Sequence, residues 1–291
     1  MKRSDMSATL VEVEPGVRVN VLELGVGDPV LLIHGWSLSS AVWDRQIRVL
    51  AETGHRVLAM DLRGHGGSDA PLGGYDIDRL AADGAAVLEA LGAAGAAVVG
   101  WSLGGMTALR MAYRYPALVE RLVLVASNGV AGARQPDYPF GVPADAIEGE
   151  MHAAEHANRL PYRRRAVGDP FGVPPDEQIL DWLHRISLQT PSWAANACMT
   201  TLLRTAQVDI LGDIDVPVTQ IIGTSDPALS VRGARWVHER ISSALVELDC
   251  GHYPMLERAD AFDAALLQAL RKDPGPTMTL VEPPSTHSVQ T

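Results

Sequence analysis

Short apolar runs rich in β-branched residues alternate along the chain with longer segments in which apolar residues recur every three or four positions. The short runs predict strands buried on both faces, and the longer segments predict helices that cover them. Six runs are expected to form buried strands: "PVLLIH", "RVLAMD", "AAVVG", "RLVLVAS", "PVTQIIG" and "ALVELD". Two earlier runs, "TLVEV" and "VRVNVLEL", flank "EPG" and predict an antiparallel hairpin. The pattern therefore predicts an α/β fold with an eight-stranded, mostly parallel sheet flanked by helices.

Capping residues mark the expected ends of the helices between these strands. Ser40 is placed to cap "AVWDRQIRVLAET", with Gly54 just beyond its end. Asp76 is placed to cap "IDRLAADGAAVLEAL", which Gly92 terminates. Two further helices are expected in "LGGMTALRMAYRY", which runs to Pro116, and in "ADAFDAALLQALRK". Such helices supply the crossovers that parallel strands require.

The alternation of strands and helices fails between residues 129 and 215. This stretch begins with "RQPDYPFGVPAD" and continues with a helical period in "AIEGEMHAAEHANRL", "PDEQILDWLHRIS" and "SWAANACMTTLLRT". A helical insertion between two sheet strands is expected over the carboxyl ends of the strands, where ligands bind in open α/β sheets. We predict a core from residues 1–128 and 216–272, a helical lid from residues 129–215, and a disordered tail from residues 273–291. Two separate domains would need a polar linker, which the sequence does not offer.

Composition narrows the classes of function. The net charge is −11 and the only lysines are Lys2 and Lys272, so no basic stripe favours nucleic acid as a partner. We expect a cytoplasmic protein without a signal peptide or a membrane span, because no long apolar run is present. Cys198 and Cys250 are too few for a disulfide framework. The one basic cluster, "RRR" at residues 163–165, is interpreted as a solvated helix face rather than a phosphate or carboxylate site.

The tetrapeptide GWSL occurs twice, and the two copies predict different roles. The second copy continues as "GWSLGG" between a strand and a helix, the G-x-S-x-G context of a nucleophile elbow, so Ser102 is the expected nucleophile. The first copy lacks the second glycine, and Ser37 is expected to be a loop residue. This loop is expected to supply a backbone N–H donor. The N–H of Trp36, together with that of Leu103 in the second copy, occupies the position of an oxyanion hole.

A nucleophilic serine needs a base, and the base needs an acid that orients it. His252 lies in a glycine-led turn after the last strand, and Asp226 directly follows the penultimate strand. The chain order Ser102, Asp226, His252 is one of the known orders of serine triads. Asp249 is a weaker candidate acid, since it stands at a strand end three residues before the histidine. Asn128 occupies the other position from which an acid could come, but an amide cannot stabilise an imidazolium by charge.

These motifs together resemble the α/β-hydrolase superfamily. The segments "HGW", "DLRGHGGSD", "GWSLGG", "GTSDP" and "GHYPMLE" follow in the expected order, and the resemblance covers residues 17–270. "HGWSLSSAVWD" and "GWSLGG" look most like the cofactor-free haloperoxidase (perhydrolase) and aryl-esterase branch, with which lactonases share much. The resemblance implies a triad of Ser102, Asp226 and His252. Dehalogenases and epoxide hydrolases are disfavoured, because they place an aspartate where this chain has Ser102.

The expected activity is serine hydrolysis of a small to mid-sized apolar ester, thioester or lactone through an acyl-enzyme, with no metal or organic cofactor. Three alternatives stay open: peroxide as the acyl acceptor, ring closure as in biosynthetic thioesterases, and a ligand receptor without turnover. The oligomeric state also stays open. The expected pocket is apolar and is lined by Trp36 and Trp101, with lid residues Trp182, Trp193 and Met199 as candidates for its roof.

Overall fold

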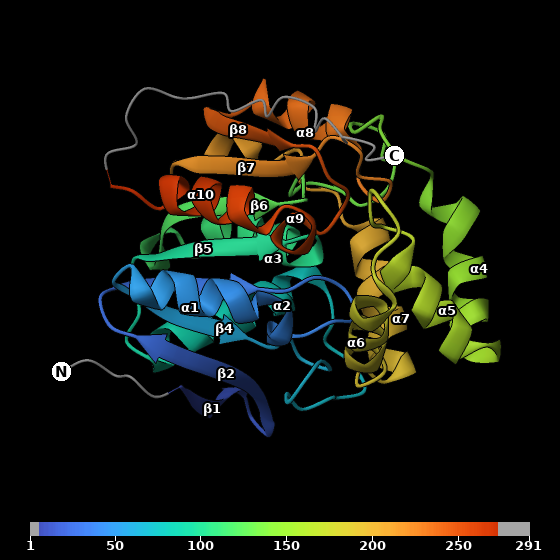
Figure 1. The fold of residues 1–291 in the computed structure, drawn as a ribbon, viewed down its shortest axis with the longest axis horizontal. Helices are drawn as coiled ribbons and strands as arrows, with labels where there is room; N and C mark the ends of the chain where they lie inside the picture. Colours follow the sequence, from blue (N-terminus) through green and yellow to red (C-terminus); the bar gives the residue numbers. More distant parts are fainter. Residues whose placement is uncertain (1–5, 273–291) are drawn as a thin grey trace, which may run out of the picture.

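A central eight-stranded sheet organises the molecule, in a computed structural model that describes residues 6–272 (Figure 1). The strand order is β1-β2-β4-β3-β5-β6-β7-β8. The pairings β1–β2 and β2–β4 are antiparallel, and all the others are parallel. The strands are β1 (Ser7–Glu14), β2 (Val17–Gly25), β3 (Asp28–Ile33), β4 (His55–Met60), β5 (Ala96–Trp101), β6 (Val119–Val125), β7 (Val218–Gly223) and β8 (Ser243–Leu248). The predicted α/β-hydrolase fold and its eight strands are confirmed.

Helices cover both faces of the sheet, as Figure 1 shows. One face carries α1 (Asp44–Glu52) and α10 (Ala259–Ala269), which the short α9 (Pro254–Glu257) precedes. The other face carries α2 (Ile77–Ala90), α3 (Leu103–Arg114) and α8 (Val231–His238). Each face buries its own apolar cluster against the sheet, so the β-branched strand residues pack on both sides.

One predicted helix cap is confirmed and one is wrong. The Asp76 side chain accepts a hydrogen bond from the Arg79 N–H and caps α2. Ser40 does not cap α1, because it is the first residue of a 3-10 turn (Ser40–Trp43) that precedes the helix, and its backbone N–H donates to an Asp61 carboxylate oxygen at 2.7 Å. Ser39 instead caps a short 3-10 turn, and α1 begins only after that turn, at Asp44.

The predicted lid segment forms four helices between β6 and β7, gathered beyond one end of the strands (Figure 1). They are α4 (Ala144–Ala157), α5 (Arg159–Gly168), α6 (Glu177–Ser187) and α7 (Ser192–Arg204). Helix α5 is not among the predicted helices, because its polar sequence shows no apolar stripe. Within residues 6–272, no helix is long and apolar enough to cross a bilayer. The predicted disordered tail lies outside the described residues.

The arginine cluster in α5 is only partly the solvated face that its sequence indicates, because Arg165 is exposed and Arg163 is not. Arg163 is fully buried and makes two hydrogen bonds to the Glu155 carboxylate, at 2.6 and 2.8 Å. Arg164 lies nearer the surface and pairs with Asp181 at 2.5 Å. Arg165 lines a cavity that Ser102 and His252 also line. The three arginines differ in burial because their partner residues elsewhere in the lid differ. The sequence does not show these partners, so its interpretation is wrong for Arg163.

Candidate active site

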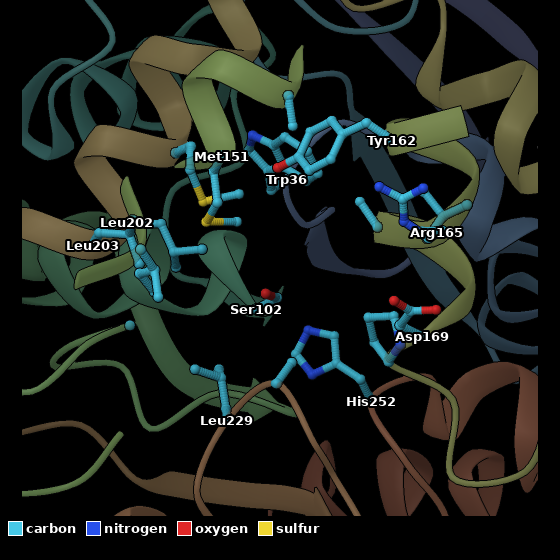
Figure 2. A pocket seen from close by; sticks show the side chains of 18 of the residues that line it. Trp36, Ser102, Met151, Tyr162, Arg165, Asp169, Leu202, Leu203, Leu229 and His252 are labelled. Carbon is cyan, nitrogen blue, oxygen red and sulfur yellow. The ribbon is translucent and has the colours of Figure 1, made fainter. Parts of the chain in front are cut away.

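A cavity of about 420 Å³ lies between the lid and the carboxyl ends of the strands. Ser102 and His252 both line it, and Figure 2 shows them next to each other. Apolar lid side chains, among them Leu202 and Leu203, stand to one side of this pair, and Arg165 stands on the other (Figure 2). The cavity therefore has an apolar half and a charged half, and the two chemically competent side chains lie between them.

The backbone of Ser102 adopts a conformation that L-residues rarely take, with φ 55° and ψ −118°. Such a residue costs about 1–3 kcal/mol, and its surroundings must hold it in place. Its N–H donates to the Val125 carbonyl at 3.0 Å, and its carbonyl accepts from the Ser127 hydroxyl at 2.9 Å. These bonds anchor the turn between β5 and α3, which places the Ser102 side chain at the cavity.

The two glycines of the elbow are required by close backbone contacts. A Cβ on Gly104 would lie 2.4 Å from the Ile33 carbonyl oxygen, at the end of β3. A Cβ on Gly100 would lie 2.2 Å from the Gly104 carbonyl oxygen. Both distances are shorter than real Cβ contacts allow, so the tight turn admits only glycine at these positions.

The two GWSL copies lie against each other at the cavity. A Cβ on Gly35 would meet the Trp101 ring at 2.8 Å and the Ser102 Cβ at 3.1 Å. Trp36 follows Gly35 and lines the cavity, while Leu103 follows Ser102 as the first residue of α3. Both peptides thus stand beside Ser102, and their role as oxyanion donors stays a prediction.

His252 and Asp226 form a buried hydrogen-bonded pair. His252 Nδ1 lies 2.8 Å from Asp226 Oδ2, and the two side chains are only 7% and 4% exposed. The other carboxylate oxygen, Oδ1, accepts from the N–H groups of Ala228 at 2.8 Å and Leu229 at 3.0 Å. These two bonds fix the carboxylate, so it holds the imidazole with Nε2 as the nitrogen left for proton exchange in the cavity.

The two alternatives to Asp226 are placed differently. Asp249 is exposed to solvent. Asn128 is buried, but its side chain closes its own turn by accepting from Val130 N–H and donating to the Ala131 carbonyl, each at 2.8 Å. Of the three candidates, Asp226 is the one that the structure pairs with His252.

Three of the five predicted pocket residues line the cavity: Trp36, Trp101 and Met199. The prediction is wrong for Trp182 and Trp193. Trp193 is 49% exposed and donates its indole N–H to the Pro71 carbonyl at 3.2 Å. Trp182 packs instead on the apolar cluster beneath α6. Both residues lie on lid helices, but on faces turned away from the cavity.

Several lining residues were not predicted. Leu202 and Leu203 lie three and four positions after Met199 on α7, so helical spacing from that residue could have identified them. Tyr162 and Arg165 come from the unpredicted helix α5. Burial raises the pKa of Tyr162 to about 12, so its hydroxyl stays protonated at neutral pH.

Two other kinds of chemistry, attack by a cysteine thiolate and binding of a metal ion, can be checked against the described residues. Burial raises the pKa of the Cys250 thiol, two positions before His252, so this thiol stays protonated and is a poor nucleophile. Across residues 6–272, no group of three or more His, Cys, Asp or Glu side chains is arranged to hold a metal ion.

Comparisons with known proteins agree with this fold. The sequence profile of the alpha/beta hydrolase fold matches residues 28–259. A non-heme chloroperoxidase of Streptomyces lividans is 37% identical over 212 residues, which are 69% of this chain and 75% of that protein. An esterase of Exiguobacterium antarcticum superposes with a TM-score of 0.86 at 26% identity, covering 90% of this chain and 98% of its own. A bromoperoxidase of Bacillus anthracis gives a TM-score of 0.85, also at 26% identity, over 91% and 99% of the two chains.

Proposed function

This chain belongs to the α/β-hydrolase family, and on that basis we propose that it is a serine hydrolase of small to mid-sized apolar esters or lactones. The observation that carries the proposal is the 2.8 Å bond between His252 and Asp226 at a cavity that Ser102 also lines. A strained serine, a histidine and a buried carboxylate are the three parts that nucleophilic acyl transfer needs.

In the proposed reaction, Ser102 Oγ attacks the substrate carbonyl while His252 Nε2 takes the hydroxyl proton. Asp226 accepts the Nδ1–H bond and stabilises the imidazolium by charge. The N–H groups of Trp36 and Leu103 donate to the oxyanion of the tetrahedral intermediate. The intermediate collapses to the acyl-enzyme, and the leaving oxygen takes the proton from His252. Water then attacks the acyl carbon through the same proton transfers and releases the acid and Ser102.

The shape of the cavity supports a substrate with an apolar acyl group. Its volume of about 420 Å³ lies within the range of small-molecule pockets. Met151, Met199, Leu202 and Leu203 form its apolar half, and methionine side chains adapt to differently shaped ligands. The proposed acyl subsite is therefore this half, with the leaving group directed toward Arg165.

Labelling with a fluorophosphonate probe tests the nucleophile. Intact mass should show one adduct on the wild type and none on Ser102→Ala, and His252→Ala should label far more slowly. A panel of p-nitrophenyl esters of increasing acyl length, together with simple lactones, then defines the substrate class. An adduct on Ser102→Ala would refute the assignment of the nucleophile.

A second candidate function is perhydrolysis, in which hydrogen peroxide replaces water in the deacylation step. The relatives named as a chloroperoxidase and a bromoperoxidase favour testing it. The test adds hydrogen peroxide and bromide to the ester assay. A peracid formed in this way would oxidise bromide to hypobromous acid and return to the carboxylic acid, and the assay follows bromination of monochlorodimedone by that hypobromous acid. Halogenation that depends on both the ester and Ser102 would support perhydrolysis, and ester cleavage without halogenation would exclude it.

A further inference from the structure

The loop that carries Trp36 is bonded to the lid on two sides. The Trp36 indole N–H donates to the Ala195 carbonyl on α7 at 2.8 Å. The hydroxyl of the next residue, Ser37, lies 3.1 Å from the Ser187 hydroxyl at the end of α6. The lid therefore contacts both the predicted oxyanion donor and the residue that follows it.

Ser37 has the second unusual backbone conformation at this site, with φ 58° on a fully buried, non-glycine residue. Its N–H donates to His65 Nε2 at 3.2 Å, and His65 Nδ1 lies 2.9 Å from the Arg63 carbonyl. Burial lowers the pKa of His65 to about 3, so the ring is neutral. Its proton is on Nδ1, directed to that carbonyl, and Nε2 is free to accept from Ser37.

Arg163 contacts Ser187 and orients the Ser187 hydroxyl toward Ser37. Its guanidinium donates to Ser187 Oγ at 3.1 Å and to the Ser187 carbonyl, and it lies 5.1 Å from the Trp36 ring. Because arginine can only donate, the Ser187 hydroxyl accepts from Arg163 and its own proton is left for Ser37 Oγ. Glu155 neutralises the buried guanidinium.

We propose that Arg163, Ser187, Ser37 and His65, here called the positioning cluster, fix the peptide N–H of Trp36 in the oxyanion hole. The lid would then set transition-state stabilisation as well as cover the cavity. None of the four side chains lines the cavity, so they act through Trp36 and not on the substrate. The inference rests on the proposed function, because that function assigns the Trp36 N–H to the oxyanion.

Two serines of the lid provide a matched test. Ser187 contacts Arg163 and Ser37, whereas Ser192 Oγ donates at 2.8 Å to Glu155, on the other side of the same ion pair. Ser187→Ala and Ser192→Ala therefore remove the same atom from the same buried network. Only the first removes the hydrogen bond to the Ser37 hydroxyl.

The readouts are kcat and KM for an ester, and inhibition by a trifluoromethyl ketone, which binds serine hydrolases as an oxyanionic hemiketal. The matching secondary alcohol, which forms no oxyanion, is the reference ligand. We expect Ser187→Ala to lower kcat and weaken the ketone about tenfold, less than the 10²–10³-fold that loss of a whole donor costs. KM and binding of the alcohol should change less than about twofold, and Ser192→Ala should resemble the wild type.

Ser37→Ala removes the same bond from its other end, and the double variant should be no worse than either single variant. This keeps the test valid if Ser187→Ala fails to fold in a thermal unfolding control. Equal losses for the ketone and the alcohol, or equal effects of Ser187→Ala and Ser192→Ala, would overturn the inference while the proposed function stands. A folded wild type that cleaves no ester and takes up no probe would overturn both.

Discussion

Replacing Asp226 by asparagine isolates the charge of the proposed acid from its geometry. Oδ1 of this carboxylate accepts two backbone N–H groups at 2.8 and 3.0 Å, and only a carbonyl-type oxygen can keep those bonds. The amide oxygen of an asparagine will therefore occupy the Oδ1 position, and its NH₂ group will face His252. That NH₂ group donates to Nδ1, so the imidazole proton moves to Nε2, where it blocks acceptance of the Ser102 proton.

The size of the effect follows from this change of tautomer. In a serine protease the corresponding change lowers kcat about 10⁴-fold, equivalent to about 5.5 kcal/mol of transition-state stabilisation. We expect a loss of that order for ester hydrolysis at neutral pH. The free energy of unfolding should change by less than about 1 kcal/mol, because both backbone bonds to the side chain persist. The assay is single-turnover hydrolysis of a p-nitrophenyl ester, alongside urea denaturation.

Asp249→Asn is the matched control, since it makes the same chemical change on an exposed carboxylate three residues before His252. It should keep wild-type kcat within about twofold. A loss of less than tenfold in Asp226→Asn would refute the reasoning from the tautomer, and a large loss in Asp249→Asn would move the acid to that residue.

Three further predictions concern stability. Gly104→Ala should lose more than about 2 kcal/mol in urea denaturation, because its Cβ would overlap a backbone oxygen, whereas Gly149→Ala, in an uncrowded helix position, should gain up to about 1 kcal/mol. Equal effects would contradict the packing argument. Arg163→Met should cost about 3 kcal/mol, the low end of the range for a broken buried ion pair, because buried Glu155 keeps only the half-buried Arg159 at 3.3 Å. Adding Glu155→Leu should recover most of this loss in thermal unfolding, and no recovery would contradict the charge explanation. The pKa of His65 is about 3 when folded and 6.5 when unfolded, so its contribution is complete above pH 6.5 and falls toward pH 3 as the unfolded chain takes up the proton. At pH 5 the loss is about 2 kcal/mol, and His65→Gln should show a correspondingly flatter dependence of stability on pH.

The fold and the proposed triad could be predicted because their signals are local in the sequence. Strands buried on both faces are short apolar runs, and the elbow of Ser102 needs its glycines within four positions. The lid was less predictable, since its helices contact the sheet domain on one face and the cavity on another. Trp193 and Met199 lie on the same helix, and only the folded structure shows which of them faces the cavity.

Buried charge was the other feature that sequence patterns could not give. Arg163 lies in a run of three arginines. Its burial depends on its ion pair with Glu155, which lies on the preceding helix α4. His65 stands in a glycine-rich turn whose sequence gives no sign of the contact with Ser37. Such groups look solvent-exposed until their partners are known.

The bonds between the lid and the sheet domain determine how a substrate can enter and leave. The Thr201 hydroxyl donates to the Tyr75 carbonyl at 2.8 Å, and the Pro170 carbonyl accepts from the backbone N–H of His252 at 2.9 Å. Swinging the lid away would break such bonds and pull on His252 itself. A ligand that passes exposed Arg165, which borders the cavity, would reach it without breaking these bonds. Under the proposed function, the first contacts that distinguish one ester from another would then be made beside Arg165, before the ester reaches Ser102.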